Sequence, residues 1–259
     1  MLKHLCVMLS FMICMPAWAN SAQNIRALID AGNYSQAQTE AENLNSAQGY
    51  ALAAESLSAQ ILLGEVDKLN RRSKEARSLS EKALALNPDL YDAKLQYALT
   101  DGFVTRTSGN ITAWRKKLPM KTYEKIQSFR SDYPDDPLGL ALEGAWHMGV
   151  VRKAGENNGG KWFGASLTEG LRLYELARKT NPSDILVTTN YAMSLLVLNP
   201  EEYGARVKPA LESVRLMSPR TDLERKVQMR ADEVIAMYDD HKKVEKLAAK
   251  FLDLSLIHI

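Results

Sequence analysis

The chain has 259 residues and a formal net charge of +2, with 33 basic and 31 acidic residues. Its composition, 46% hydrophobic and 25% charged, is that of an ordinary globular protein, which excludes a disordered chain, a collagen and a disulfide scaffold. A chain of this length buries an ample core without a metal or a disulfide. Because nucleic-acid-binding domains are usually strongly basic, the near-neutral charge predicts no nucleic-acid partner.

Residues 1–19 have the pattern of a secretory signal peptide. Lys3 and His4 precede an apolar run over residues 5–15, and Ala17-Trp18-Ala19 matches a cleavage site. The run is shorter than the ~20 apolar residues that a membrane span needs, so we expect no stable membrane insertion after cleavage. The alternative is a buried first helix.

Both cysteines, Cys6 and Cys14, lie in this predicted signal peptide, so the predicted mature chain from Asn20 has none. That chain could form no disulfide, thiolate nucleophile or cysteine metal site. An exported protein without cysteine fits the bacterial periplasm, which is the predicted location.

Residues 254–259, Leu-Ser-Leu-Ile-His-Ile, match the translation of a common transposase sequencing adaptor. We interpret them as an adaptor-derived tail, to be left out of the fold. The alternative is the apolar end of a helix. The adaptor interpretation predicts that the natural chain continues past Asp253, so that the domain over 20–253 is truncated at its C-terminus.

Apolar residues recur at spacings of three and four, which indicates amphipathic helices and an all-α fold. One such stripe, over residues 71–86, consists of Ala76, Leu79, Ala83 and Leu86. A second, over residues 163–180, consists of Leu167, Leu171, Tyr174 and Ala177.

Prolines and capping residues predict where these helices begin and end. A proline biases the preceding residue away from the helix, and five pairs are expected to separate helices: Asn87-Pro88, Tyr133-Pro134, Asn181-Pro182, Asn199-Pro200 and Ser218-Pro219. Ser166 with Glu169, and Thr221 with Glu224, have the spacing of a capping box.

Small residues stand at fixed offsets from these prolines and indicate close approach of helices: Ala76, Ala83, Ala98, Gly144, Gly170, Ala177 and Ala192. With Gly32-Asn33-Tyr34, Ala37 and Leu63-Gly64, the pattern resembles the tetratricopeptide repeat (TPR), a 34-residue helix–turn–helix unit. The resemblance implies an α-solenoid of antiparallel helical hairpins over 20–253, a superhelix whose concave surface binds a protein or peptide partner. Intervals longer than one repeat between prolines predict two inter-helix insertions, near residues 104–118 and 155–164.

Groups for catalysis are sparse. The segment 20–253 has two histidines, His147 and His241, without metal-ligand spacing, and Ser166 lacks the second glycine of a nucleophile elbow. Residues 155–161 satisfy G-x-x-x-x-G-K, but Trp162 replaces the Ser or Thr that would hold magnesium, which disfavours a nucleotide site. We predict a flexible glycine-rich insertion there, and a protein that is not an enzyme and has no cofactor or metal.

Cations and aromatic residues around the second insertion are the candidate partner-binding residues: Trp146, His147, Arg152, Lys161, Trp162 and Phe163. If these side chains are exposed, they could bind a peptide carboxylate, a sugar or a lipid head group. We expect instead that Trp162 and Phe163 are buried and cap the hairpin, and that His147 is a packed or groove-facing residue.

The first insertion carries a second basic cluster, Trp114-Arg115-Lys116-Lys117. Its cations could meet anionic lipid or an acidic partner, or could form a solvated face. Both insertions are predicted to project from one side of the array.

Three functional hypotheses follow. The first is a non-enzymatic periplasmic TPR-like protein that binds a protein or peptide partner through its concave surface. The second is a small-ligand-binding TPR-like component associated with a solute transporter. The third is the helical scaffold of a cell-wall enzyme whose catalytic domain is missing.

Overall fold

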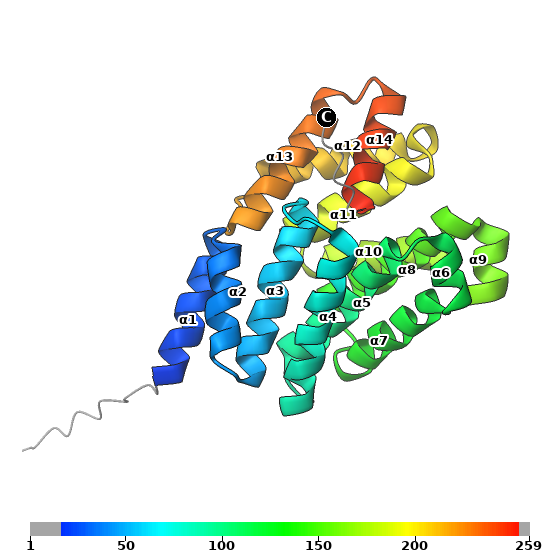
Figure 1. Ribbon diagram of the computed structural model, residues 1–259. Coiled ribbons are helices and arrows are strands. Elements are labelled where there is room, and N and C mark those ends of the chain that lie inside the picture. The colour runs from blue at the N-terminus through cyan, green and yellow to red at the C-terminus, as the bar shows by residue number, and fades with distance from the viewer. Residues whose placement is uncertain (1–16, 254–259) are drawn as a thin grey trace, which may run out of the picture.

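The structure, a computed structural model, describes residues 17–253. Residues 1–16, most of the predicted signal peptide, and residues 254–259, the predicted adaptor-derived tail, lie outside the described residues. Within the described range all regular secondary structure is helical, so the prediction of an all-α fold is confirmed (Figure 1). The helices are α1 (Ala17–Asp30), α2 (Tyr34–Asn43), α3 (Ala47–Leu63), α4 (Leu69–Leu86), α5 (Tyr91–Thr107), α6 (Asn110–Arg115), α7 (Leu118–Asp132), α8 (Pro137–Ala154), α9 (Glu156–Phe163), α10 (Leu167–Thr180), α11 (Ile185–Leu198), α12 (Pro200–Leu216), α13 (Asp222–Ala236) and α14 (His241–Leu252).

The predicted helix boundaries are confirmed. α4, α7, α10 and α11 each end at the residue before a predicted X-Pro pair, and α12 ends two residues before Ser218. Both predicted caps form: the Ser166 hydroxyl accepts a hydrogen bond from the Glu169 backbone N–H, and Thr221 Oγ1 accepts one from the Glu224 N–H at 3.1 Å. These caps satisfy N–H groups that the first turn of a helix leaves without partners.

The predicted stripe on α4 needs one correction. Ala76, Leu79 and Ala83 are buried, but Leu86 is 59% exposed. At this end of α4 it is Leu84 that packs, in a small apolar cluster with Tyr50 of α3. Leu86 is the last residue of its helix and lies beyond that cluster, so spacing alone assigned it to the wrong side.

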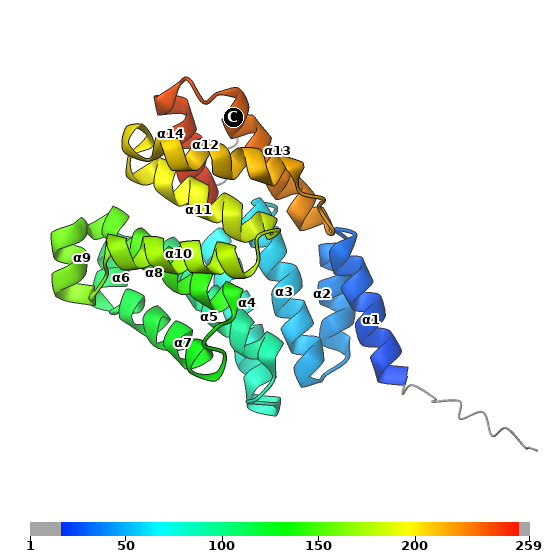
Figure 2. The ribbon, with the colours of Figure 1, turned by 180° about the vertical axis from the view of Figure 1, so that it is seen from behind.

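Consecutive helices pack against each other along most of the described chain. α1 to α4 stand side by side, and the chain then runs through α5 to α10 and on to α11 to α14 (Figures 1 and 2). α8 and α10 approach closely where Gly144 faces Gly170: a Cβ on Gly144 would lie 3.1 Å from the Gly170 carbonyl oxygen. The predicted close approach at these two glycines is confirmed.

The last helices return to the first ones. α13 contacts α1 and α3; the Tyr34 hydroxyl donates to Asp222 at 3.2 Å, and Lys226 Nζ lies 2.6 Å from Glu65 Oε1. Arg230 donates to the Leu62 carbonyl at the end of α3, at 3.0 Å. This return (Figure 2) leaves the end of α14 beside α5 and α8.

None of the described helices combines the length and the apolar character that crossing a membrane requires.

Candidate ligand cavity

The two insertions form short helices, α6 and α9, that contact each other. The Trp114 ring packs edge-on against Trp162, with ring centroids 5.6 Å apart, and against Phe163 at 5.9 Å. The two segments predicted as insertions therefore lie next to each other in the fold.

The second insertion is not the flexible segment that we predicted. Gly155 and Gly164, with φ of 78° and 72°, sit at its two ends, and the residues between them form α9. Gly159 is buried, and a Cβ there would meet Val150 and the Val151 backbone at 3.6 Å. α9 is thus a short helix that packs directly on α8, an arrangement that composition alone does not reveal.

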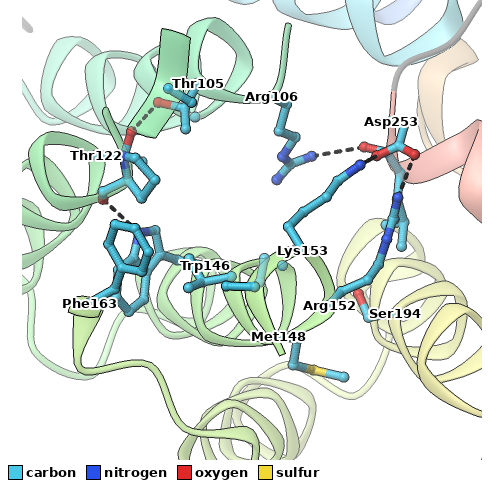
Figure 3. Close-up of a pocket in the computed structure, with 18 of the residues that line it drawn as sticks. Thr105, Arg106, Thr122, Trp146, Met148, Arg152, Lys153, Phe163, Ser194 and Asp253 are labelled. Atoms are coloured by element: carbon cyan, nitrogen blue, oxygen red, sulfur yellow. Dashed lines mark hydrogen bonds and ion pairs between the residues drawn. The ribbon is translucent and has the colours of Figure 1, made fainter. Parts of the chain in front are cut away.

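A cavity of about 670 Å³ lies between these two short helices and α5, α7, α8 and α11, with the end of α14 at its side (Figure 3). The volume is in the range of ~300–1,000 Å³ typical of small-molecule sites. Most of the wall is apolar and aromatic; the largest side chains in it are Trp114, Leu142, Trp146, Met148, Trp162 and Phe163.

One end of the cavity is cationic. Arg106 comes from the last turn of α5, and Arg152 and Lys153 come from the last turn of α8. Both residues of α8 are paired with Asp253, Lys153 Nζ at 3.2 Å. Across the opening lie Trp146 and Phe163 (Figure 3). Among the described residues that line the cavity, three cations therefore face one carboxylate.

Arg106 is the least compensated of these cations. It is accessible from the cavity, while protein atoms surround the site, and this desolvation lowers the pKa of its guanidinium. The charge of Arg152 lowers that pKa further, and Tyr174 and Asp253 oppose the shift. Desolvation is the largest cause of this shift, and the neighbouring charge of Arg152 acts in the same direction.

Polar groups in the wall are held by their own partners. Trp146 Nε1 donates to the Pro119 carbonyl at 2.7 Å, which fixes the indole with its ring along the cavity. Thr122 donates to the buried carboxylate of Asp101 at 2.7 Å, and its hydroxyl lies 2.8 Å from that of Thr105. The shape of the cavity is therefore set by side chains with fixed orientations.

Four of the six predicted site residues line this cavity: Trp146, Arg152, Trp162 and Phe163. Trp162 is 53% exposed and Phe163 is half-buried, so the expectation that both are buried is wrong. The reason is that α9 projects them toward Trp114 and the cavity instead of into the core. Lys161 is exposed, with its ammonium 5.4 Å from the centre of the Trp162 ring, and does not line the cavity.

Arg106 and Asp253 are the site residues that the sequence analysis missed. A basic residue in the last turn of a helix is common, because it complements the helix dipole, so Arg106 carries no distinguishing signal. Asp253 reaches the site because the C-terminal helices fold back over the chain.

His147 is a packed residue, as we predicted. It is buried outside the cavity lining, where its Nδ1 accepts a hydrogen bond from the Ser166 backbone N–H at 3.1 Å. Its Nε2 lies 3.9 Å from Glu143 Oε1. The neutral imidazole therefore helps to hold the start of α10. Burial lowers the pKa of His147, and the carboxylates of Glu143 and Glu169 oppose this shift.

This geometry predicts a loss of stability in acid. The folded state binds a proton at His147 less readily than the unfolded chain does. The contribution of the neutral imidazole to the free energy of unfolding is therefore fully present above the unfolded-state pKa of about 6.5. It is lost as the pH falls through the lower folded-state pKa. Urea midpoints at pH 7 and pH 5 should fall more for the wild type than for His147→Gln, whose amide oxygen can still accept the Ser166 N–H. Equal falls would contradict this assignment.

The segment that satisfies G-x-x-x-x-G-K does not have the setting of a phosphate-binding loop. Such a loop follows a strand, whereas residues 155–161 follow α8 and form α9. Over residues 17–253 no group of three or more His, Cys, Asp or Glu side chains is arranged to hold a metal ion.

A scan of the sequence against models of known protein families finds no match, and a search of curated proteins finds no significantly similar sequence.

Proposed function

We propose that this chain is a TPR-like α-solenoid of helical hairpins that acts by binding, without catalysing a reaction. Packing of consecutive helices, and proline pairs between them, support this proposal. So does the close approach of α8 and α10 at Gly144 and Gly170, two of the small positions on which the resemblance rests. A periplasmic location is part of the same proposal and is supported by the signal-peptide pattern of residues 1–19.

The function that the geometry supports best is the binding of a small, mainly apolar molecule, as in a ligand-binding component associated with a solute transporter. The observation that carries this proposal is the 670 Å³ cavity with its aromatic wall. Small-molecule sites are typically concave and mainly apolar, with a few polar groups that fix the orientation of the ligand.

Gly149 of α8 offers a direct test. It lines the cavity, and a Cβ there would meet no atom within 4 Å, so a side chain at this position projects into open space. The neutral fluorescent probe N-phenyl-1-naphthylamine should bind the wild type saturably and one to one. Gly149→Trp should lose this binding by filling the cavity, and Gly149→Ala, which occupies little of it, should keep it.

Thermal denaturation provides a second measurement. A bound molecule at 100 times its dissociation constant stabilises the folded state by about 2.7 kcal/mol, so the probe should raise the Tm of the wild type and of Gly149→Ala. Absence of saturable binding, or equal binding by Gly149→Trp, would overturn the proposal. A circular dichroism spectrum matching that of the wild type confirms that Gly149→Trp is folded.

A protein or peptide partner is the second candidate. Three large apolar side chains on the two short helices are exposed, Ile111 at 85%, Trp114 at 55% and Trp162 at 53%, and exposed aromatic residues are frequent anchors of interfaces. This candidate would be favoured if no small molecule binds while the wild type and Gly149→Trp capture the same protein equally well.

A further inference from the structure

We propose that the cavity selects an oxyanion carried on an apolar body, with Arg106 as the principal contact of the anionic group. This inference rests on the proposed function and specifies its ligand class. Arg152 and Lys153 complete the anion-binding end, and the apolar body lies along Trp146 and Phe163.

Asp253 shows how this end of the cavity receives a carboxylate. Its two oxygens are shared between Arg152 and Lys153, with Lys153 Nζ at 3.2 Å. A ligand carboxylate entering the same end would meet the same kind of donors. Arginine and carboxylate or phosphate groups pair in a fork geometry, which makes such contacts both strong and oriented.

Arg106 has capacity for such a partner. Among the described residues, its hydrogen bond is to the Leu252 carbonyl oxygen, at 3.5 Å, whereas a guanidinium has five N–H donors. Its side chain is exposed and lines the cavity, so a ligand there can reach these donors. A ligand oxyanion between Arg106 and Lys153 would supply the negative charge that Asp253 alone does not.

The aromatic wall excludes a bare inorganic anion as the best occupant. A phosphate or sulfate ion would fill only the cationic end and would leave the surface formed by Trp146 and Phe163 in contact with water. A purely apolar molecule would leave the cations unpaired. A molecule that is anionic at one end and apolar at the other satisfies both parts of the cavity.

The experiment compares ligands that share a body and differ in charge, each added in competition with the neutral probe. Decanoate is paired with 1-decanol, and 1-naphthoate with 1-naphthamide; decyl phosphate and inorganic phosphate complete the set. Hydrogen bonds to charged groups correspond to roughly ten- to hundredfold in affinity, so each anion should displace the probe at concentrations about ten- to hundredfold lower than its neutral partner. Comparison of decanoate, 1-naphthoate and decyl phosphate then identifies which apolar body and which anionic group fit the cavity best.

Variants at the cationic end make the test specific. Arg106→Gln should reduce the affinity for decanoate by at least about tenfold more than it reduces the affinity for the neutral probe, and a circular dichroism spectrum matching that of the wild type shows that the variant is folded. Asp253→Asn removes the internal carboxylate and should increase the affinity for decanoate by about tenfold. Arg115→Gln is the matched control, because Arg115 is an exposed cation of α6 that does not line the cavity.

Three outcomes would contradict this inference, and each is distinguishable from a failure of the proposed function. If the probe binds in a Gly149-dependent manner but charged and neutral ligands compete equally, the proposed function stands and the anion preference is wrong. An unchanged affinity of Arg106→Gln for decanoate overturns the inference as well. If inorganic phosphate competes as well as decyl phosphate, the role of the aromatic wall is refuted.

Discussion

Replacing Gly144 by leucine is expected to destabilise the protein by about 3 kcal/mol or more, because the new side chain has no room between α8 and α10. A Cβ on Gly144 would lie 2.9 Å from Tyr174 Cδ2 and 3.1 Å from the Gly170 carbonyl oxygen. Tyr174 is fully buried and packs on Tyr191, with ring centroids 5.7 Å apart, so it has no free space to enter. Urea unfolding followed by circular dichroism measures the loss.

The same substitution five residues later is the control. Gly149 lies on the same helix, but a Cβ there meets nothing within 4 Å. Leucine in place of glycine also favours the helix by up to ~1 kcal/mol. Gly149→Leu should therefore be as stable as the wild type or more stable, and a loss equal to that of Gly144→Leu would show that the spacing between α8 and α10 is not the cause.

Arg130→Met should cost about 3–5 kcal/mol, the effect of leaving a buried charge without its partner. Glu143 of α8 is 5% exposed and pairs with Arg130 of α7. Its remaining hydrogen bonds come from neutral groups, Gln127 at 2.8 Å and the Tyr123 hydroxyl at 3.3 Å. The free energy of unfolding of each variant in urea provides the measurement.

Two further variants separate the buried charge from other effects of the substitution. Arg130→Met/Glu143→Met removes both charges and should recover a large part of the loss, since apolar pairs often replace buried ion pairs without cost. Arg172→Met breaks an exposed pair with Glu169 and should cost less than about 1 kcal/mol. A double variant no more stable than Arg130→Met would refute this account.

The sequence was informative where the structure depends on local chemistry. A proline excludes its predecessor from the helix, so Asn87-Pro88 and Asn181-Pro182 mark boundaries whatever the tertiary contacts are. The caps at Ser166 and Thr221 depend on residues three positions apart. Gly144 and Gly170 were recognisable because two helices that approach closely need small residues at the crossing.

The cavity depends on long-range contacts, and these were not predictable in the same way. Arg152 and Asp253 are 101 positions apart in the chain. Trp162 was expected to be buried as a cap on the hairpin, but the glycine-rich segment before it forms a helix that turns the indole toward Trp114. A pattern of spacings reports which side of a helix is apolar and does not report whether that side meets a core or a cavity.

The return of α13 to the first helices affects how the ends of the fold can separate. In a linear array with free ends, helix pairs contact only their neighbours and the terminal pairs fray independently. Here a hydrogen bond joins Tyr34 to Asp222, 188 positions further along the chain, so the first helices and α13 hold each other in place. α14 contacts α13 and borders the cavity at Leu252, so we expect separation of α13 from the first helices to disturb that side of the cavity as well. The contacts between the two ends of the described chain therefore also help to hold one side of the cavity in place.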